Sequence, residues 1–186
     1  MEYDEFLHQR RARMAELTRV AYRQLGGEPD KPPLSPPWFL PGAEAAWQRI
    51  AETERALRGL VRDVYSARFG DGAAVSIETA LPARERETLT RALRARPVGA
   101  DPLTLVDYLY LGQLPALLFG NDVWPLAKAR LGDASDARQR LQLGISQIAP
   151  VRNEIAHVRE VAPDRLLRAT VACSDLLALL RFEARH

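Results

Sequence analysis

Apolar residues recur every three or four positions through most of this chain of 186 residues, and this spacing predicts amphipathic helices. The segment of residues 41–72 is expected to form one long helix that stops at Gly70-Asp71-Gly72. The apolar face of that helix comprises Trp47, Ile50, Leu57, Leu60, Val61 and Val64. The best candidate for a strand, residues 73–81, is weak. The sequence therefore predicts an all-α fold.

Further helical segments complete the predicted bundle. They are residues 81–97, 101–119, 121–133, 133–161 and 163–182. Gly112 and Pro115 are expected to divide the second of these segments into two short helices. Asn121 or Asp122 is expected to cap the helix of the third segment. The residues expected to face inward on the last helix are Leu166, Leu167, Thr170, Val171, Cys173, Leu177 and Leu180.

The N-terminal part of the chain is predicted to be separate from this bundle. Residues 1–25 carry a helical apolar stripe, which indicates an N-terminal helical arm. Residues 26–41 follow as a linker, because two glycines and a run of prolines cannot continue a helix and favour an extended chain. A ligand for an SH3-type domain is the alternative interpretation of the prolines. The main helical domain is expected over residues 42–186.

Composition excludes several classes of protein. A single cysteine, Cys173, excludes an internal disulfide framework and any zinc site built from cysteines, which favours a reducing environment. No run of 18 apolar residues is present, so no membrane span is expected. The acidic N-terminus has no apolar signal core, and a cytoplasmic location is expected. The net charge of +2 is too small to indicate nucleic acid by itself.

The motifs that bind cofactors or metals are also absent from the sequence. It contains neither a glycine-rich phosphate loop nor an H-E-x-x-H pair. Its three histidines, His8, His157 and His186, are too scattered to form a histidine-rich metal site. We therefore expect no cofactor and no metal, and any catalysis must use the side chains alone.

The stretch Arg152-Asn153-Glu154-Ile155-Ala156-His157 is the best candidate for a functional site. An arginine five residues before a histidine is weak evidence alone, since Arg181 and His186 repeat the spacing at the C-terminus. The first match differs because Asn153 follows its arginine and could orient the imidazole of His157, four residues on. In the alternative interpretation, His157 is an ordinary residue near a helix end, and Arg152 forms a salt bridge with Glu154 or Asp164.

A histidine and an arginine suffice to cleave RNA without a metal. Histidine has a pKa near neutrality and can take the proton of a 2′-hydroxyl as a general base. Arginine can hold the phosphate and stabilise the charge that develops on it. DNA lacks this hydroxyl and would not be cut by this route. The predicted catalytic residues are therefore Arg152 and His157, with Asn153 beside them.

With this motif the sequence resembles the HEPN superfamily (higher eukaryotes and prokaryotes nucleotide-binding). The resemblance lies in "RNEIAH", in the preceding "DYLYLGQLPALLFGNDVWPLAKARL" and in the closing helix, and it is greatest for the subset with an R-N-x-x-A-H motif. It covers roughly residues 42–183. The resemblance implies an antiparallel helical bundle that forms a homodimer, so that two motifs face each other in a cleft.

The resemblance also implies a function for the three motif residues. Many members are metal-independent endoribonucleases that act as toxins or in defence against phages, and Arg152 and His157 would be the catalytic pair. A separate antitoxin or defence effector would then be a partner, beside the RNA substrate. Other members are inactive, so a non-catalytic interaction or RNA-binding module is the alternative. Tyr108 and Tyr110 either flank the cleft or, more commonly for such residues, pack against the bundle.

Overall fold

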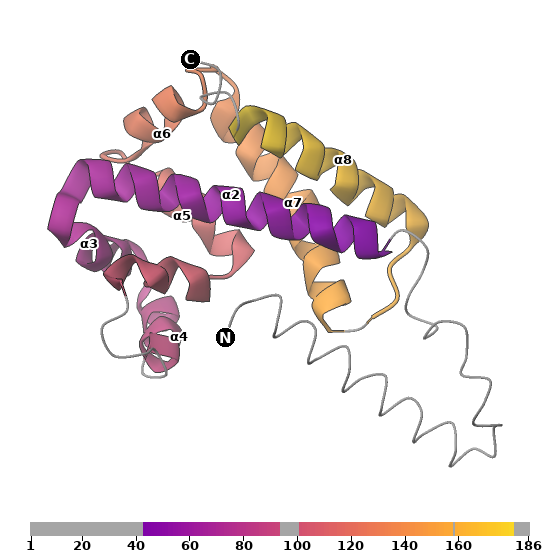
Figure 1. Ribbon diagram of the computed structural model, residues 1–186, viewed down its shortest axis with the longest axis horizontal. Helices are drawn as coiled ribbons and strands as arrows, with labels where there is room; N and C mark the ends of the chain where they lie inside the picture. Colours follow the sequence, from indigo (N-terminus) through magenta and orange to yellow (C-terminus); the bar gives the residue numbers. More distant parts are fainter. Residues whose placement is uncertain (1–42, 94–100, 158, 181–186) are drawn as a thin grey trace, which may run out of the picture. The chain divides into compact units, whose positions relative to one another are not determined.

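The computed structural model describes residues 43–93, 101–157 and 159–180, and every regular element among them is helical (Figure 1). This confirms the prediction of an all-α fold. The predicted arm of residues 1–25 and the linker of residues 26–41 lie outside the described residues, as does the second Arg–His match at the C-terminus.

The described elements alternate between long helices and short helical turns. The α-helices are α2 (Ala43–Phe69), α3 (Ala73–Ala80), α4 (Ala83–Leu93), α5 (Leu114–Leu118), α6 (Trp124–Arg130), α7 (Ala137–Ala156) and α8 (Pro163–Leu180). The 3-10 helices are η1 (Gly70–Gly72), η2 (Pro102–Tyr108) and η3 (Leu111–Gln113). No helix in these ranges is both long and apolar enough to cross a membrane.

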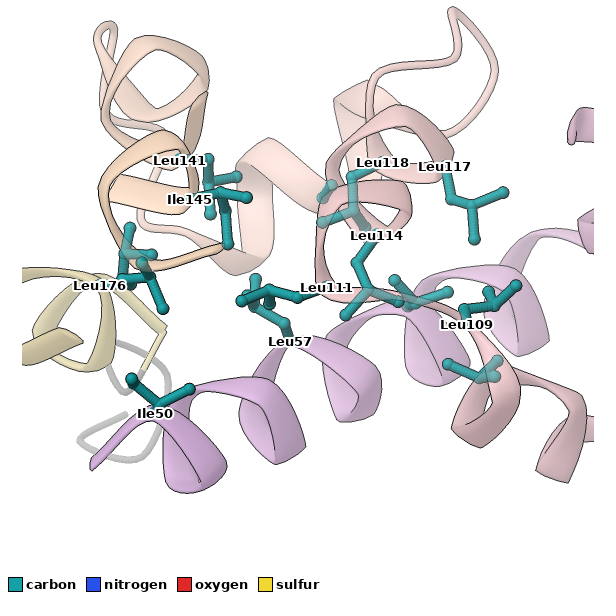
Figure 2. Packing of buried hydrophobic residues seen from close by; sticks show 14 of the residues in the cluster. Ile50, Leu57, Leu109, Leu111, Leu114, Leu117, Leu118, Leu141, Ile145 and Leu176 are labelled. Atoms are coloured by element: carbon teal, nitrogen blue, oxygen red, sulfur yellow. The ribbon is translucent and has the colours of Figure 1, made fainter. Parts of the chain in front are cut away.

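Helix α2 is the centre of the packing. It lies against both α7 and α8, which also pack on each other (Figure 1). Of the predicted apolar face, Ile50, Leu57, Val61 and Val64 are buried, whereas Trp47 and Leu60 are partly buried. Figure 2 shows Ile50 and Leu57 turned toward the neighbouring helices. Each leucine or isoleucine side chain buried in this way contributes roughly 1.5–3 kcal/mol to stability. The helices of this core therefore hold one another in place through α2.

Helices α7 and α8 approach closely at Gly144. A Cβ atom at this position would lie 2.7 Å from Cγ of Leu176, a separation that real Cβ atoms essentially never show. Because Leu176 is fully buried against α7, it has no free space into which it could move. The glycine thus permits the close contact between the helix that carries the motif and the closing helix.

The weak strand candidate of residues 73–81 contains α3, in agreement with the all-α prediction. Other local predictions are wrong. Neither Asn121 nor Asp122 caps the next helix, because the N-cap of α6 is Val123, one or two residues later, and this helix has no side-chain cap. Segment 101–119 forms two 3-10 helices and α5, and Gly112 lies within η3 instead of at a break. Pro115 occupies the first turn of α5, where its missing N–H costs nothing.

The predicted inward face of α8 is also partly wrong. Leu167 and Val171 are exposed, by 65% and 52% of their surface. The buried residues are Leu166, Ala169, Ala172, Cys173, Leu176, Leu177 and Leu179. Because apolar residues occur on both sides of α8, periodicity alone does not decide which side faces α2 and α7.

Candidate functional site

The motif forms the C-terminal end of α7. Arg152 to Ala156 are helical, and His157 is the residue that caps the helix. Its backbone N–H donates a hydrogen bond of 3.0 Å to the carbonyl of Asn153. Pro150 lies within α7 and does not end it, so the motif continues the amphipathic helix instead of following it. The motif therefore lies on a helix, α7, whose inner face packs against the bundle.

Arg152 is directed toward α2. Its Nε atom lies 3.6 Å from Oε1 of Glu54, and its Nη1 atom donates a hydrogen bond of 3.5 Å to Oδ1 of Asn153. The side chain of Arg152 is 24% exposed, whereas Glu54 is buried. The ion pair of Arg152 with Glu154 or Asp164, which belonged to the alternative interpretation, is replaced by this contact with an acidic residue almost 100 positions earlier in the chain.

Glu54 is shared between two arginines. The Nη2 atom of Arg58 donates to Oε1 of Glu54 at 3.2 Å, one helical turn along α2. Arg58 also donates to the carbonyls of Val106 and Leu109, at 3.2 Å and 3.1 Å, and thereby holds the segment around η2. The three side chains Arg152, Glu54 and Arg58 are called the arginine–glutamate cluster below. With two guanidinium groups and one carboxylate, this cluster carries one surplus positive charge.

The other charged residue of the motif has a separate partner. Glu154 accepts a hydrogen bond of 2.8 Å from Nη1 of Arg165 on α8, so its charge is balanced within the bundle. Ile155 packs, partly buried, against the core. Two buried polar atoms of the described residues have no hydrogen-bond partner, Nε of Arg152 and Oε2 of Glu154, and both belong to this motif.

Asn153 and His157 lie on the solvent side. Both are exposed, and their positions four residues apart place them on one face of α7. Arg152 is about 140° from His157 around the helix axis. Among the described residues, Arg152 and Asn153 are thus connected by a hydrogen bond, while His157 is exposed to solvent at the end of the same helix.

Sequence reasoning did not find Glu54 and Arg58. A signal for Glu54 was present, since this acidic residue lies four positions after Ile50 and three before Leu57, within the apolar face of α2. A charge on a buried helix face requires a partner of opposite sign. The identity of that partner depends on how α2 and α7 pack, which periodicity does not reveal.

Tyr108 and Tyr110 are less packed than most such residues. They are 39% and 59% exposed, on either side of the buried Leu109. The carbonyl of Leu109 is held by Arg58, which connects this stretch to the arginine–glutamate cluster. Trp47 and Trp124 are partly buried, and Trp124 lies edge-on to Phe119. The two tyrosines are therefore the more accessible aromatic residues of this region.

Within the described ranges there is no group of three or more histidine, cysteine, aspartate or glutamate side chains that could hold a metal ion. Comparisons with models of protein families, with curated proteins and with solved structures gave no match to this chain. The function must therefore be argued from the residues of the motif and their surroundings.

Proposed function

We propose that this protein is a metal-independent endoribonuclease and that Arg152 and His157 cleave RNA by attack of the 2′-hydroxyl on the adjacent phosphate. The observation that carries the proposal is that Arg152, a member of the positively charged arginine–glutamate cluster, lies on the same helix as the exposed His157, five residues before it. A phosphate is attracted to such a charge, and a neighbouring imidazole can take the proton of the attacking hydroxyl. The resemblance to the HEPN superfamily points to the same chemistry.

Each residue has a separate step in this mechanism. His157 removes the proton from the 2′-oxygen, which then bonds to phosphorus while the bond to the 5′-oxygen of the next nucleotide breaks. Arg152 binds the non-bridging oxygens, on which negative charge increases in the transition state. Asn153, which accepts a hydrogen bond from Arg152 and lies about one helical turn before His157, orients the imidazole. The products are a 2′,3′-cyclic phosphate and a 5′-hydroxyl.

A homodimer is part of this proposal. Arg152 and His157 point to different sides of α7, about 140° apart. A second copy of the chain would supply the complementary residue across a shared cleft, in the manner that the family resemblance implies. A toxin or phage-defence role, with a separate antitoxin or effector chain, follows from the same resemblance.

The test compares four proteins on total RNA and tRNA in the presence of EDTA. Wild type and Arg168→Ala should cleave equally, because Arg168 is an exposed arginine of α8 that pairs with Asp164, one helical turn earlier. His157→Ala should lose roughly 10²–10⁴-fold in rate, and Arg152→Ala roughly 10²–10³-fold. If the wild type is folded and dimeric but cuts no RNA, the proposal fails. RNA binding without cleavage would then favour the non-catalytic module.

A further inference from the structure

We propose that Glu54 is a positioning residue that acts through Arg152. Its buried carboxylate holds the inner edge of the guanidinium, so that the outer edge is presented to the phosphate of the substrate. This inference rests on the proposed function, since it concerns how the phosphate-binding residue is held. It adds to the motif a residue from a different helix, α2, which the R-x4-H spacing does not contain.

The burial of Glu54 is the first observation. Glu54 lies within the apolar face of α2 and is 3% exposed. A buried carboxylate must be paired, and well-packed apolar residues in place of a buried ion pair are often neutral or stabilising. Stability alone therefore does not account for an acidic residue here. A role in holding the guanidinium groups of its partners accounts for the acidic residue.

The direction of the contact is the second observation. Nε of Arg152, the atom near Glu54, is buried and forms no hydrogen bond among the described residues. The carboxylate thus attracts the inner side of the guanidinium through charge. A bidentate contact with phosphate uses two N–H groups along one edge of a guanidinium. With the Nε side turned toward Glu54, the phosphate would meet the edge formed by the two Nη groups, of which Nη1 also donates to Oδ1 of Asn153 at 3.5 Å.

Arg58 explains why Glu54 does not cancel the charge of Arg152. Arg58 donates to the same carboxylate oxygen and is itself fixed by the carbonyls of Val106 and Leu109. Its side chain is largely buried. The charge of Glu54 is therefore balanced by Arg58 from inside the protein, and the charge of Arg152 remains available at the surface.

The variant that tests this role is Glu54→Gln. Its amide oxygen can still accept the hydrogen bond from Arg58, but the charge that holds Arg152 is gone. We expect kcat to fall roughly 10- to 100-fold, as for a misplaced catalytic group, and KM to change less. The matched control is Asp107→Asn. It removes a carboxylate that pairs with Arg62, an ion pair that likewise joins α2 to the η2 segment. This control should retain wild-type kcat.

A double-mutant cycle separates positioning from a structural effect. If Glu54 acts through Arg152, then Glu54→Gln should have little further effect on kcat in an Arg152→Lys background. A loss of the same size in both backgrounds would contradict the inference. If Glu54→Gln does not fold, Glu54→Asp is used instead. Aspartate keeps the negative charge but places it one methylene farther from Arg152, so this variant should also lower kcat.

A measurement without RNA distinguishes this inference from the proposed function. The Nε–H group of Arg152 can be observed by nitrogen-15 NMR and assigned from its disappearance in Arg152→Lys. We expect a signal from a restrained side chain in the wild type and motional averaging in Glu54→Gln. An unchanged signal, or a Glu54→Gln protein that cleaves RNA as fast as wild type or faster, overturns the inference. Wild type that cuts no RNA overturns the proposed function, while the NMR comparison still decides whether Glu54 restrains Arg152.

Discussion

Oε1 of Glu54 accepts a hydrogen bond from Arg58 and lies 3.6 Å from Nε of Arg152, so one carboxylate on α2 serves arginines from two helices. The two contacts are unequal. Arg58 is bound to the carboxylate and to two backbone carbonyls, whereas Arg152 approaches the carboxylate at ion-pair distance and is more exposed. Arg58 thus has the contacts of a structural residue, whereas the guanidinium of Arg152 stays accessible to a ligand.

This difference predicts unequal effects on stability. Arg58→Met leaves the carbonyls of Val106 and Leu109 and the carboxylate of Glu54 without that donor, and should lower the free energy of unfolding by about 2–3 kcal/mol. Arg152→Met retains the packing of the side-chain stem and leaves Glu54 paired with Arg58. It should therefore lower the free energy of unfolding by at most about 1 kcal/mol. Urea unfolding of both variants measures this. An Arg152→Met protein that is the less stable of the two would contradict the unequal roles.

The orientation of α8 predicts a second pair of outcomes. Leu166 is buried and its neighbour Leu167 is exposed, although the sequence pattern is compatible with both facing inward. Leu166→Ala should destabilise the protein by about 2–5 kcal/mol, whereas Leu167→Ala should change stability by less than about 0.5 kcal/mol. Thermal and urea unfolding provide the comparison. Equal losses would mean that α8 is rotated relative to the structure.

Periodicity predicts where the helices of this chain lie but not how they face one another. The helical spacing predicts the segments of α2, α7 and α8 because each buries apolar residues along its length. It does not select the buried side of α8, since apolar residues occur on both sides and only the packing against α2 and α7 decides between them. For the same reason the motif is visible in the sequence but its contact with Glu54 is not. That contact joins residues far apart in the chain.

Two helical glycines, Gly144 of α7 and Gly59 of α2, are expected to respond in opposite ways to substitution by alanine. Gly144→Ala should destabilise the protein by about 1–3 kcal/mol, because its Cβ meets the side chain of the buried Leu176. Gly59→Ala, within α2, meets nothing within 4 Å. This variant should stabilise by up to about 1 kcal/mol, through the higher helix propensity of alanine. Equilibrium unfolding in urea tests both. A neutral Gly144→Ala would show that the two helices can separate without cost.

Tyr65 predicts how stability depends on pH. Burial raises the pKa of its hydroxyl above the ordinary value of 10.0. The unfolded chain therefore ionises first, so the contribution of Tyr65 is fully present below pH 10.0 and is lost as the pH rises toward the pKa of the folded state. Tyr65→Phe should cost about 0.5–1.5 kcal/mol at neutral pH, because the hydroxyl donates to the carbonyl of Leu117.

The measurement is the difference in free energy of unfolding between wild type and Tyr65→Phe at neutral pH and at about pH 10.5. The difference should shrink at the higher pH, where the wild type alone loses the tyrosine contribution. Burial also raises the pKa of Cys173, but this thiol is present in both proteins and its effect cancels. A difference that stays constant between the two pH values would show that Tyr65 is not shielded from solvent.

The most direct test of the central claim is the chemistry of the ends that the wild-type protein leaves on RNA in EDTA. Attack by the 2′-hydroxyl, with His157 as the general base, predicts 2′,3′-cyclic phosphate and 5′-hydroxyl ends, and His157→Ala should form them roughly 10²–10⁴-fold more slowly. A substrate with 2′-deoxynucleotides throughout should remain intact. Products with 3′-hydroxyl and 5′-phosphate ends, or cleavage by His157→Ala at the wild-type rate, would contradict the account.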